Sequence, residues 1–183
     1  PDELYGGDGQ LTRAELRAIA LASLAPRAGE RLWDVGAGSG TIAIEWCRGA
    51  AGATAVAIER REDRARTIGE NASVLGAPGV QVVVGAAPLA LEGLPQPDAI
   101  FVGGGPAVPG LIDGCWQALR AGGRLVAAAV TLEGEAALAA AHATYGGRLV
   151  RIETSHAEPL GSFTGWKPQR PVVQWSATKE PQG

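Results

Sequence analysis

The 183-residue sequence contains no methionine and only two cysteines. Cys47 and Cys115 have neither CxxC spacing nor a nearby histidine, which argues against a metal site or a disulfide framework. No hydrophobic run approaches the roughly 20 residues that a membrane-spanning helix needs. The start of the chain, PDE, lacks the pattern of a secretory signal. We therefore expect a soluble, cytoplasmic protein with no metal and no membrane partner.

Positive charge is not in excess, because the sequence has 16 Lys and Arg residues against 19 Asp and Glu residues, which gives a net charge of −3. A nucleic-acid-binding domain usually carries a basic stripe, so we expect no nucleic-acid partner and only local anion sites. The length and the hydrophobic content of 46% suit one well-buried domain over residues 1–183. Because residue 1 is proline, we expect this domain to belong to a longer polypeptide.

The hydrophobic patterning predicts an α/β fold. Thr12 and Glu15 have the spacing of a capping box and predict a first helix that ends near Pro26 and Gly29. Alternating segments follow, with strands expected at 31–35, 54–59, 80–84, 98–102 and 124–130, and helices at 41–48, 62–75, 111–119 and 132–143. Strands separated by helices imply crossover connections and a mostly parallel sheet covered on both faces.

The last fifth of the chain departs from this alternation. Residues 148–156 and 171–178 are strand-like, and the loop between them contains prolines and glycines but no helix pattern. Two strands without a crossover helix pair best as an antiparallel hairpin, which we expect at the sheet edge. The result is the seven-stranded, Rossmann-like arrangement of class I methyltransferases.

A glycine-rich turn follows the first predicted strand. Three glycines there leave room for a ligand, and the next helix start offers unpaired N–H groups. The spacing is GxGxG, not the GxGxxG that accommodates a pyrophosphate, and the carboxylate of Asp34 would repel one. The Asp34 carboxylate suits the amino group or the sulfonium of S-adenosylmethionine. The structural alternative is a plain turn in which Asp34 only caps the end of the strand. The candidate cofactor residues here are Asp34, Gly36, Ala37, Gly38, Ser39 and Gly40.

The other strand ends add further candidates. Glu59 lies about 20 residues beyond the glycines, where a carboxylate can accept hydrogen bonds from both ribose hydroxyls. Ala86 and Ala87 are small enough for an adenine to lie against the backbone. Residues 103–105 are all glycine, which favours close approach of a ligand, with Gly103 assigned to the cofactor and Gly104 and Gly105 to the substrate. The alternative for Glu59 is an exposed surface glutamate, and the alternative for Ala86 and Ala87 is a simple turn. For residues 103–105 it is a flexible loop.

Four segments together identify a family resemblance: GQLTRAE at 9–15, WDVGAGSG at 33–40, AIFVGGG at 99–105 and VTLE at 130–133. They resemble the decarboxylating precorrin-6Y C5,15-methyltransferases of cobalamin biosynthesis, specifically the domain that methylates C15 and decarboxylates the C12 acetate arm. The resemblance spans nearly the whole chain. It implies S-adenosylmethionine as cofactor, a tetrapyrrole substrate, assembly as a homotetramer and, in bifunctional members, fusion behind a C5-methylating domain.

The resemblance also implies that Thr12, Gly36 to Gly40, Glu59 and Ala87 contact S-adenosylmethionine. One departure is Ala128, where similar proteins carry asparagine, so we assign no polar role there.

The remaining candidates concern substrate and catalysis. Cations suit the carboxylates of a tetrapyrrole and an aromatic ring suits its face, so the substrate candidates are Arg13, Arg17, Trp166, Lys167 and Arg170. For each cation a solvated surface charge is the alternative. His156 is a candidate for proton transfer, and so is Glu133, although a carboxylate in a first helical turn also favours the helix dipole.

Three other functions stay open at this point: a class I methyltransferase acting on RNA or protein, a nicotinamide-dependent oxidoreductase, and a non-catalytic binding module. The acidic balance opposes RNA, and the GxGxG spacing opposes a dinucleotide.

Overall fold

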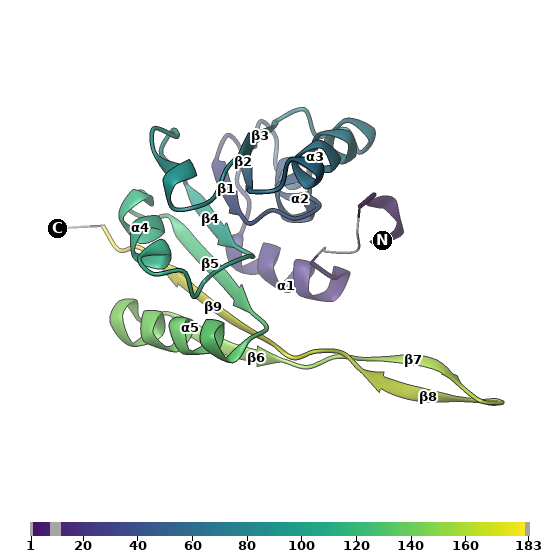
Figure 1. Ribbon diagram of the computed structural model, residues 1–183. Coiled ribbons are helices and arrows are strands. Elements are labelled where there is room, and N and C mark those ends of the chain that lie inside the picture. The colour runs from purple at the N-terminus through teal and green to yellow at the C-terminus, as the bar shows by residue number, and fades with distance from the viewer. Residues whose placement is uncertain (1, 8–11, 182–183) are drawn as a thin grey trace.

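The computed structural model describes residues 2–7 and 12–181. It contains a seven-stranded sheet in the order β3-β2-β1-β4-β5-β9-β6 (Figure 1). The strands of this sheet are β1 Arg31–Val35, β2 Thr54–Glu59, β3 Val80–Val84, β4 Ala99–Val102, β5 Arg124–Ala129, β6 Arg148–Ile152 and β9 Val172–Thr178. Strands β1 to β5 are mutually parallel, and β9 is antiparallel to both of its neighbours. The predicted seven-stranded, mostly parallel sheet is confirmed.

Helices cover both faces of the sheet. They are α1 Ala14–Leu24, α2 Thr41–Gly49, α3 Glu62–Val74, α4 Leu111–Ala118 and α5 Leu132–Tyr145, with short 3-10 helices η1 Asp2–Leu4 and η2 Leu89–Leu91. Side chains of β1 alternate between the two faces, as a strand requires. Leu32 joins the core cluster of α1, α2 and α3, whereas Trp33 and Val35 join the cluster of α4 and α5.

The antiparallel pair predicted at the sheet edge is confirmed, because β6 pairs with β9, and β9 lies between β5 and β6. The segment that connects these two strands needs a correction. The connecting loop forms a separate two-stranded ribbon, β7 Ser155–Leu160 and β8 Phe163–Pro168, which projects from the body (Figure 1). Prolines opposed a strand prediction, but a two-stranded ribbon tolerates them because the outer side of each strand has no neighbour to bond.

The start of α1 also differs from the prediction. Thr12 does not cap the helix, because Arg13 occupies the N-cap position and makes no side-chain cap hydrogen bond. Instead Oδ2 of Asp2 accepts a hydrogen bond of 3.3 Å from the N–H of Ala14. A residue of η1 therefore replaces the predicted local cap, which sequence spacing cannot reveal. Residues 9–11 of the first family segment lie outside the described residues.

Within the described part of the chain, no helix is long and apolar enough to cross a membrane.

Candidate functional site

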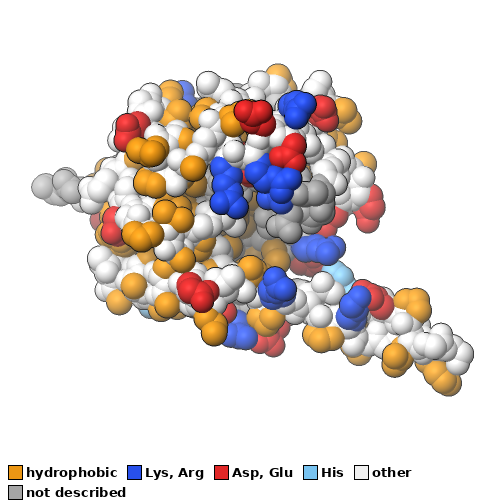
Figure 2. Space-filling view, in the orientation of Figure 1, with side chains coloured by type: hydrophobic (Ala, Val, Ile, Leu, Met, Phe, Trp, Pro, Cys, Tyr) orange, Lys and Arg blue, Asp and Glu red, His pale blue; other side chains and the backbone are white. Residues whose placement is uncertain are grey.

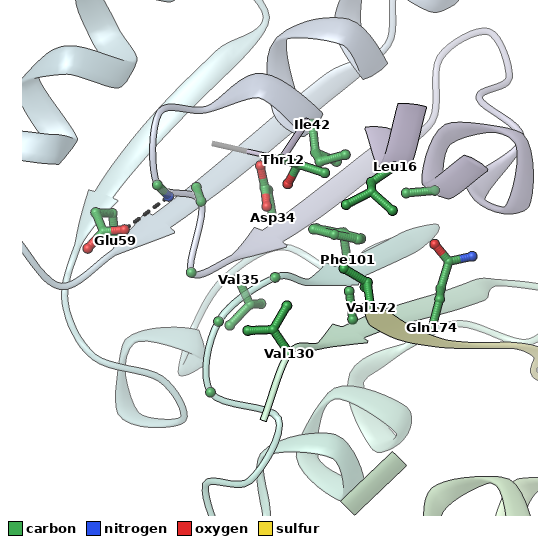
Figure 3. Close-up of a pocket in the computed structure, with 18 of the residues that line it drawn as sticks. Thr12, Leu16, Asp34, Val35, Ile42, Glu59, Phe101, Val130, Val172 and Gln174 are labelled. Atoms are coloured by element: carbon green, nitrogen blue, oxygen red, sulfur yellow. Dashed lines mark hydrogen bonds between the residues drawn. The ribbon is translucent and has the colours of Figure 1, made fainter. Parts of the chain in front are cut away.

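A cleft of about 770 Å³ opens at the carboxyl ends of β1 and β4. The strand order reverses between these two strands, and ligands of open α/β sheets bind at such a switch point. The cleft is lined by nine of the predicted cofactor residues: Thr12, Asp34, Gly36, Ala37, Gly38, Glu59, Ala86, Ala87 and Gly103. Figure 3 shows Glu59 towards one end of this cleft and Gln174 towards the other, with Asp34 between them.

Glu59 closes β2 and is 4% exposed. One carboxylate oxygen accepts a hydrogen bond of 3.0 Å from the N–H of Gly38 (Figure 3), and the other accepts one of 3.0 Å from the N–H of Arg61. A carboxylate has about four lone-pair sites, so two more hydrogen bonds can be accepted. The acid is thus fixed beside the glycine turn with acceptor capacity left for a ligand.

Ser39 and Gly40 have a different role from the one predicted, since neither lines the cleft. The carbonyl oxygen of Ser39 accepts a hydrogen bond of 3.0 Å from the side-chain amide of Asn71. Gly40 has φ +78°, and a Cβ atom there would lie 2.7 Å from Cγ2 of Ile68. These two residues hold the turn against α3, so they shape the cleft from behind.

Asp34 is buried beneath the glycine turn, and its Oδ2 atom accepts a hydrogen bond of 3.0 Å from the N–H of Ala43 in α2. Burial, with a smaller contribution from the charge of Glu59, raises the pKa of Asp34 to about 7. The side chain also lines the cleft. Asp34 therefore anchors the start of α2 and also presents an acid to the cavity.

The turn after β4 forms the opposite wall. Gly103, Gly104 and Gly105 all line the cleft. The carbonyl oxygen of Val35 accepts hydrogen bonds from the N–H groups of Gly103, at 2.9 Å, and Gly104, at 3.3 Å. The β4 turn is thereby tied directly to the end of β1, which argues against the alternative of a flexible loop.

We call the part of the cleft that α1 and the base of the ribbon line the outer lobe, and the part that the glycine turns line the inner lobe. The polar residues that line the outer lobe include Arg13, Glu15, Thr154, His156, Gln169, Arg170 and Gln174. The Nε2 atom of His156 lies 3.2 Å from Oε1 of Glu15. Leu16, Val130 and Val172 supply an apolar surface between the two lobes (Figure 3).

Arg17 corrects a prediction, because it does not line the cleft. The residue is 4% exposed, and its guanidinium pairs with Asp2 at 2.9 Å and donates to the Thr12 carbonyl at 2.7 Å. The guanidinium also lies over the ring of Tyr5. Arg17 thus anchors the segment before α1, whereas Arg13, one helical turn earlier, lines the cleft.

Three further candidates also lie away from the cleft. Trp166 is exposed on β8, and the neighbouring Lys167 pairs with Glu158 at 2.8 Å within the ribbon. Glu133 is exposed in the first turn of α5, where Thr131 is the N-cap. Trp166 and Lys167 lie away from the cleft because the ribbon projects from the body. A carboxylate in a first helical turn interacts favourably with the helix dipole, which explains Glu133.

Two cleft residues that were not predicted are Arg60 and Arg64. Their only signal was a basic run directly after β2. On the face shown in Figure 2, basic side chains gather around the hollow between the body and the ribbon. The described residues contain no group of three or more His, Cys, Asp or Glu side chains placed to hold a metal ion.

Comparison with known proteins shows which family shares this arrangement. Residues 3–179 match the family described as "Precorrin methyltransferase domain". The chain is 56% identical over 180 residues to a Mycobacterium tuberculosis protein named precorrin-6Y C(5,15)-methyltransferase [decarboxylating], covering 98% of this chain and 45% of that protein. It is 33% identical to the cobalt-precorrin-6B C(15)-methyltransferase (decarboxylating) of Salmonella typhimurium, covering 98% of this chain and 95% of that one.

Among solved structures, the C-terminal domain of precorrin-6Y C5,15-methyltransferase from Rhodobacter capsulatus superposes with a TM-score of 0.91 and 47% sequence identity. That match covers 98% of this chain and 96% of the other. The chain spans only 43–45% of the length of precorrin-6Y relatives with 53–56% identity.

Proposed function

The chain belongs to the precorrin methyltransferase family, and from this premise we propose that it transfers a methyl group from S-adenosylmethionine to C15 of a precorrin-6-type tetrapyrrole and removes the carboxyl group of the C12 acetate arm. The observation that carries the proposal is the two-lobed cleft. One lobe is built from glycine turns around a buried acid, and the other has an apolar surface edged by arginines.

The inner lobe fits an adenosyl cofactor. Glu59 retains acceptor capacity beside the glycine turn for the two ribose hydroxyls. Ala86 and Ala87 leave a flat surface for adenine, and Asp34 faces the cavity with an acid that suits a cationic group. Bound there, S-adenosylmethionine would supply an electrophilic methyl group. The protein then has to align the methyl group with the substrate carbon, and such alignment can lower the activation barrier by about 7–11 kcal/mol.

The outer lobe fits the edge of a carboxylate-rich macrocycle. Arg13 and Arg170 line the outer lobe and come from two separate segments, and guanidinium groups bind carboxylates in a fixed planar geometry. Val130 and Val172 offer an apolar surface for the ring face. Together these residues would orient the substrate and exclude water from the reacting arm.

The setting of the domain is part of the proposal. We infer that residues 1–183 form one unit of a longer bifunctional polypeptide, which the greater length of the precorrin-6Y relatives supports. Association of copies into a tetramer is supported by the exposed apolar side chains of the ribbon, Leu160, Phe163 and Trp166. A cytoplasmic location agrees with the two free cysteines.

Product analysis tests the proposed reaction. The chain is incubated with S-adenosylmethionine and a precorrin-6-type substrate, with and without cobalt, and the products are examined by mass spectrometry. We expect gain of one methyl group and loss of CO₂. In parallel, calorimetry should show saturable binding of S-adenosylhomocysteine that Gly38→Val abolishes. Absence of binding, or binding that Gly38→Val leaves unchanged, would overturn the proposal.

A further inference from the structure

The outer lobe contains a histidine and glutamate pair that the cofactor-binding role does not use. We propose that His156 donates the proton that the decarboxylation consumes and that Glu15 is its positioning residue. This inference rests on the proposed function and deepens it, because it assigns a residue to one of the two reactions. It starts from a requirement of atom balance.

Loss of CO₂ from an acetate arm converts R–CH₂–COO⁻ and one proton into R–CH₃ and CO₂. The bond between the CH₂ carbon and the carboxyl carbon breaks, CO₂ leaves, and the electron pair passes into the conjugated macrocycle. The pair returns to form a new C–H bond when a proton reaches the CH₂ carbon. No oxidant or reductant is needed, but an acid must reach the arm in the outer lobe.

The geometry places one such acid there. His156 lies near the start of β7, at the base of the ribbon, and Glu15 lies in the first turn of α1, 141 residues away in the chain. The two side chains approach to 3.2 Å and are 37% and 50% exposed, so both remain accessible from the cleft that they line. A carboxylate at this distance can accept a hydrogen bond from the imidazole ring and so hold the ring in one orientation.

The other titratable groups that line the cleft are less suited to this task. The arginines keep their protons at any ordinary pH. Glu59 is an acceptor for two backbone N–H groups, and Asp34 is buried under the glycine turn, where it accepts from Ala43. The sequence contains one other histidine, His142, which lies on α5 and does not line the cleft.

The charged groups around His156 come from three elements. Glu15 and Arg13 belong to α1 or its N-cap, and Arg170 lies between β8 and β9. Lys167 is the cross-strand partner of His156 on β8, and its ammonium is paired with Glu158. Glu15 is therefore the carboxylate that offsets the positive charge near the imidazole.

The test compares His156→Gln with His142→Gln in the full chain, and measures methyl transfer and CO₂ release separately across pH 5 to 9. Since an imidazole changes charge between about pH 5 and 8, wild-type CO₂ release should fall as pH rises through this range. We expect His156→Gln to lower CO₂ release by about 10²-fold or more and to flatten its pH profile. Affinity for S-adenosylhomocysteine should stay within about twofold, and His142→Gln should match the wild type.

Glu15 is tested by its own pair of variants. Glu15→Gln should lower CO₂ release and change its pH profile, and Glu15→Asp should restore part of both, which a merely structural contact would not do. The inference is overturned if His156→Gln releases CO₂ at the wild-type rate, or if it slows both reactions while leaving the pH profile unchanged. A wild-type chain that makes no methylated product overturns the proposed function itself, which is a separate result.

Discussion

Gly36 and Gly104 meet backbone to backbone across the floor of the cleft. A Cβ atom on Gly36 would lie 2.8 Å from both the N and Cα atoms of Gly104. The two glycines come from the turns after β1 and β4, the strands between which the sheet order reverses. Their absence of side chains lets the two turns touch, and this contact sets the depth of the cleft.

Replacing Gly36 with alanine should separate the two turns. The matched control is Gly93→Ala, because Gly93 has nearly the same φ, +72° against +73°, but no atom within 4 Å of a Cβ position. Both variants carry the strain of a left-handed alanine, about 1–2 kcal/mol. Gly36→Ala should lose a further 1–3 kcal/mol or so from overpacking and should lose binding of S-adenosylhomocysteine. Equal unfolding free energies in urea would contradict this account.

Glu59→Gln should weaken binding at the proposed adenosyl site without unfolding the protein. The variant keeps an oxygen acceptor for Gly38 or Arg61 but loses the negative charge, and hydrogen bonds to a charged group contribute about 1.5–3 kcal/mol. We expect the dissociation constant of S-adenosylhomocysteine, measured by calorimetry, to rise at least tenfold. Glu62→Gln, an exposed change in the first turn of α3, should leave it unchanged. If both variants bind equally, Glu59 does not hold the ribose.

Asp34 makes stability depend on pH. Its folded pKa of about 7 lies above the ordinary 3.8, so the folded state holds the proton more tightly than the unfolded chain. The resulting stabilisation is fully present below pH 3.8 and is lost as pH rises through about 7.

Asp34→Asn imitates the protonated acid and removes this dependence. From pH 5 to pH 8, the unfolding free energy of the variant relative to the wild type should therefore rise by about 2.5–3 kcal/mol. Urea titrations at several pH values measure it, and parallel curves for the two proteins would refute the raised pKa.

Arg124 joins β5 to the end of α1 and also forms a buried ion pair with Glu30, which directly precedes β1. The guanidinium contacts both carboxylate oxygens, at 2.5 and 2.9 Å, and donates to the carbonyl oxygens of Leu24 and Ala25. Burial alone would raise the pKa of Glu30, but the hydrogen bond and charge of Arg124 outweigh it and hold the pKa below the ordinary 4.5. Stability from this pair is present above pH 4.5 and is lost as pH falls through the lowered value.

Arg124→Met should cost about 3–5 kcal/mol at pH 7, because it leaves a buried carboxylate with less compensation. The variant should also lose less stability than the wild type on acidification below pH 4. Arg148→Met, at an exposed position of β6, should change stability by less than about 0.5 kcal/mol. Equal effects of the two substitutions in urea unfolding would show that the buried pair contributes little.

The local pattern of apolar and turn residues was sufficient to predict the strands at the centre of the sheet. The bounds of β1, β2 and β3 agree with the predicted segments residue for residue, since each strand is a short apolar or β-branched run bounded by turn residues. Pattern failed at the ribbon, where Pro159 and Gly165 argued against strands. It also failed at Arg17, because a residue distant from the helix pattern, Asp2, turns that side chain away from the cleft.

The sequence by itself determined the alternation of strands and helices, the glycine turn after β1 and the acid at the end of β2, because these depend on short-range periodicity and spacing. Only the tertiary structure decided that Ser39 and Gly40 lie behind the cleft, that Arg60 lines it, and that Glu15 approaches His156. The reason is physical: contacts between residues far apart in the chain depend on how elements pack and which way each side chain then points, and no local pattern encodes that direction.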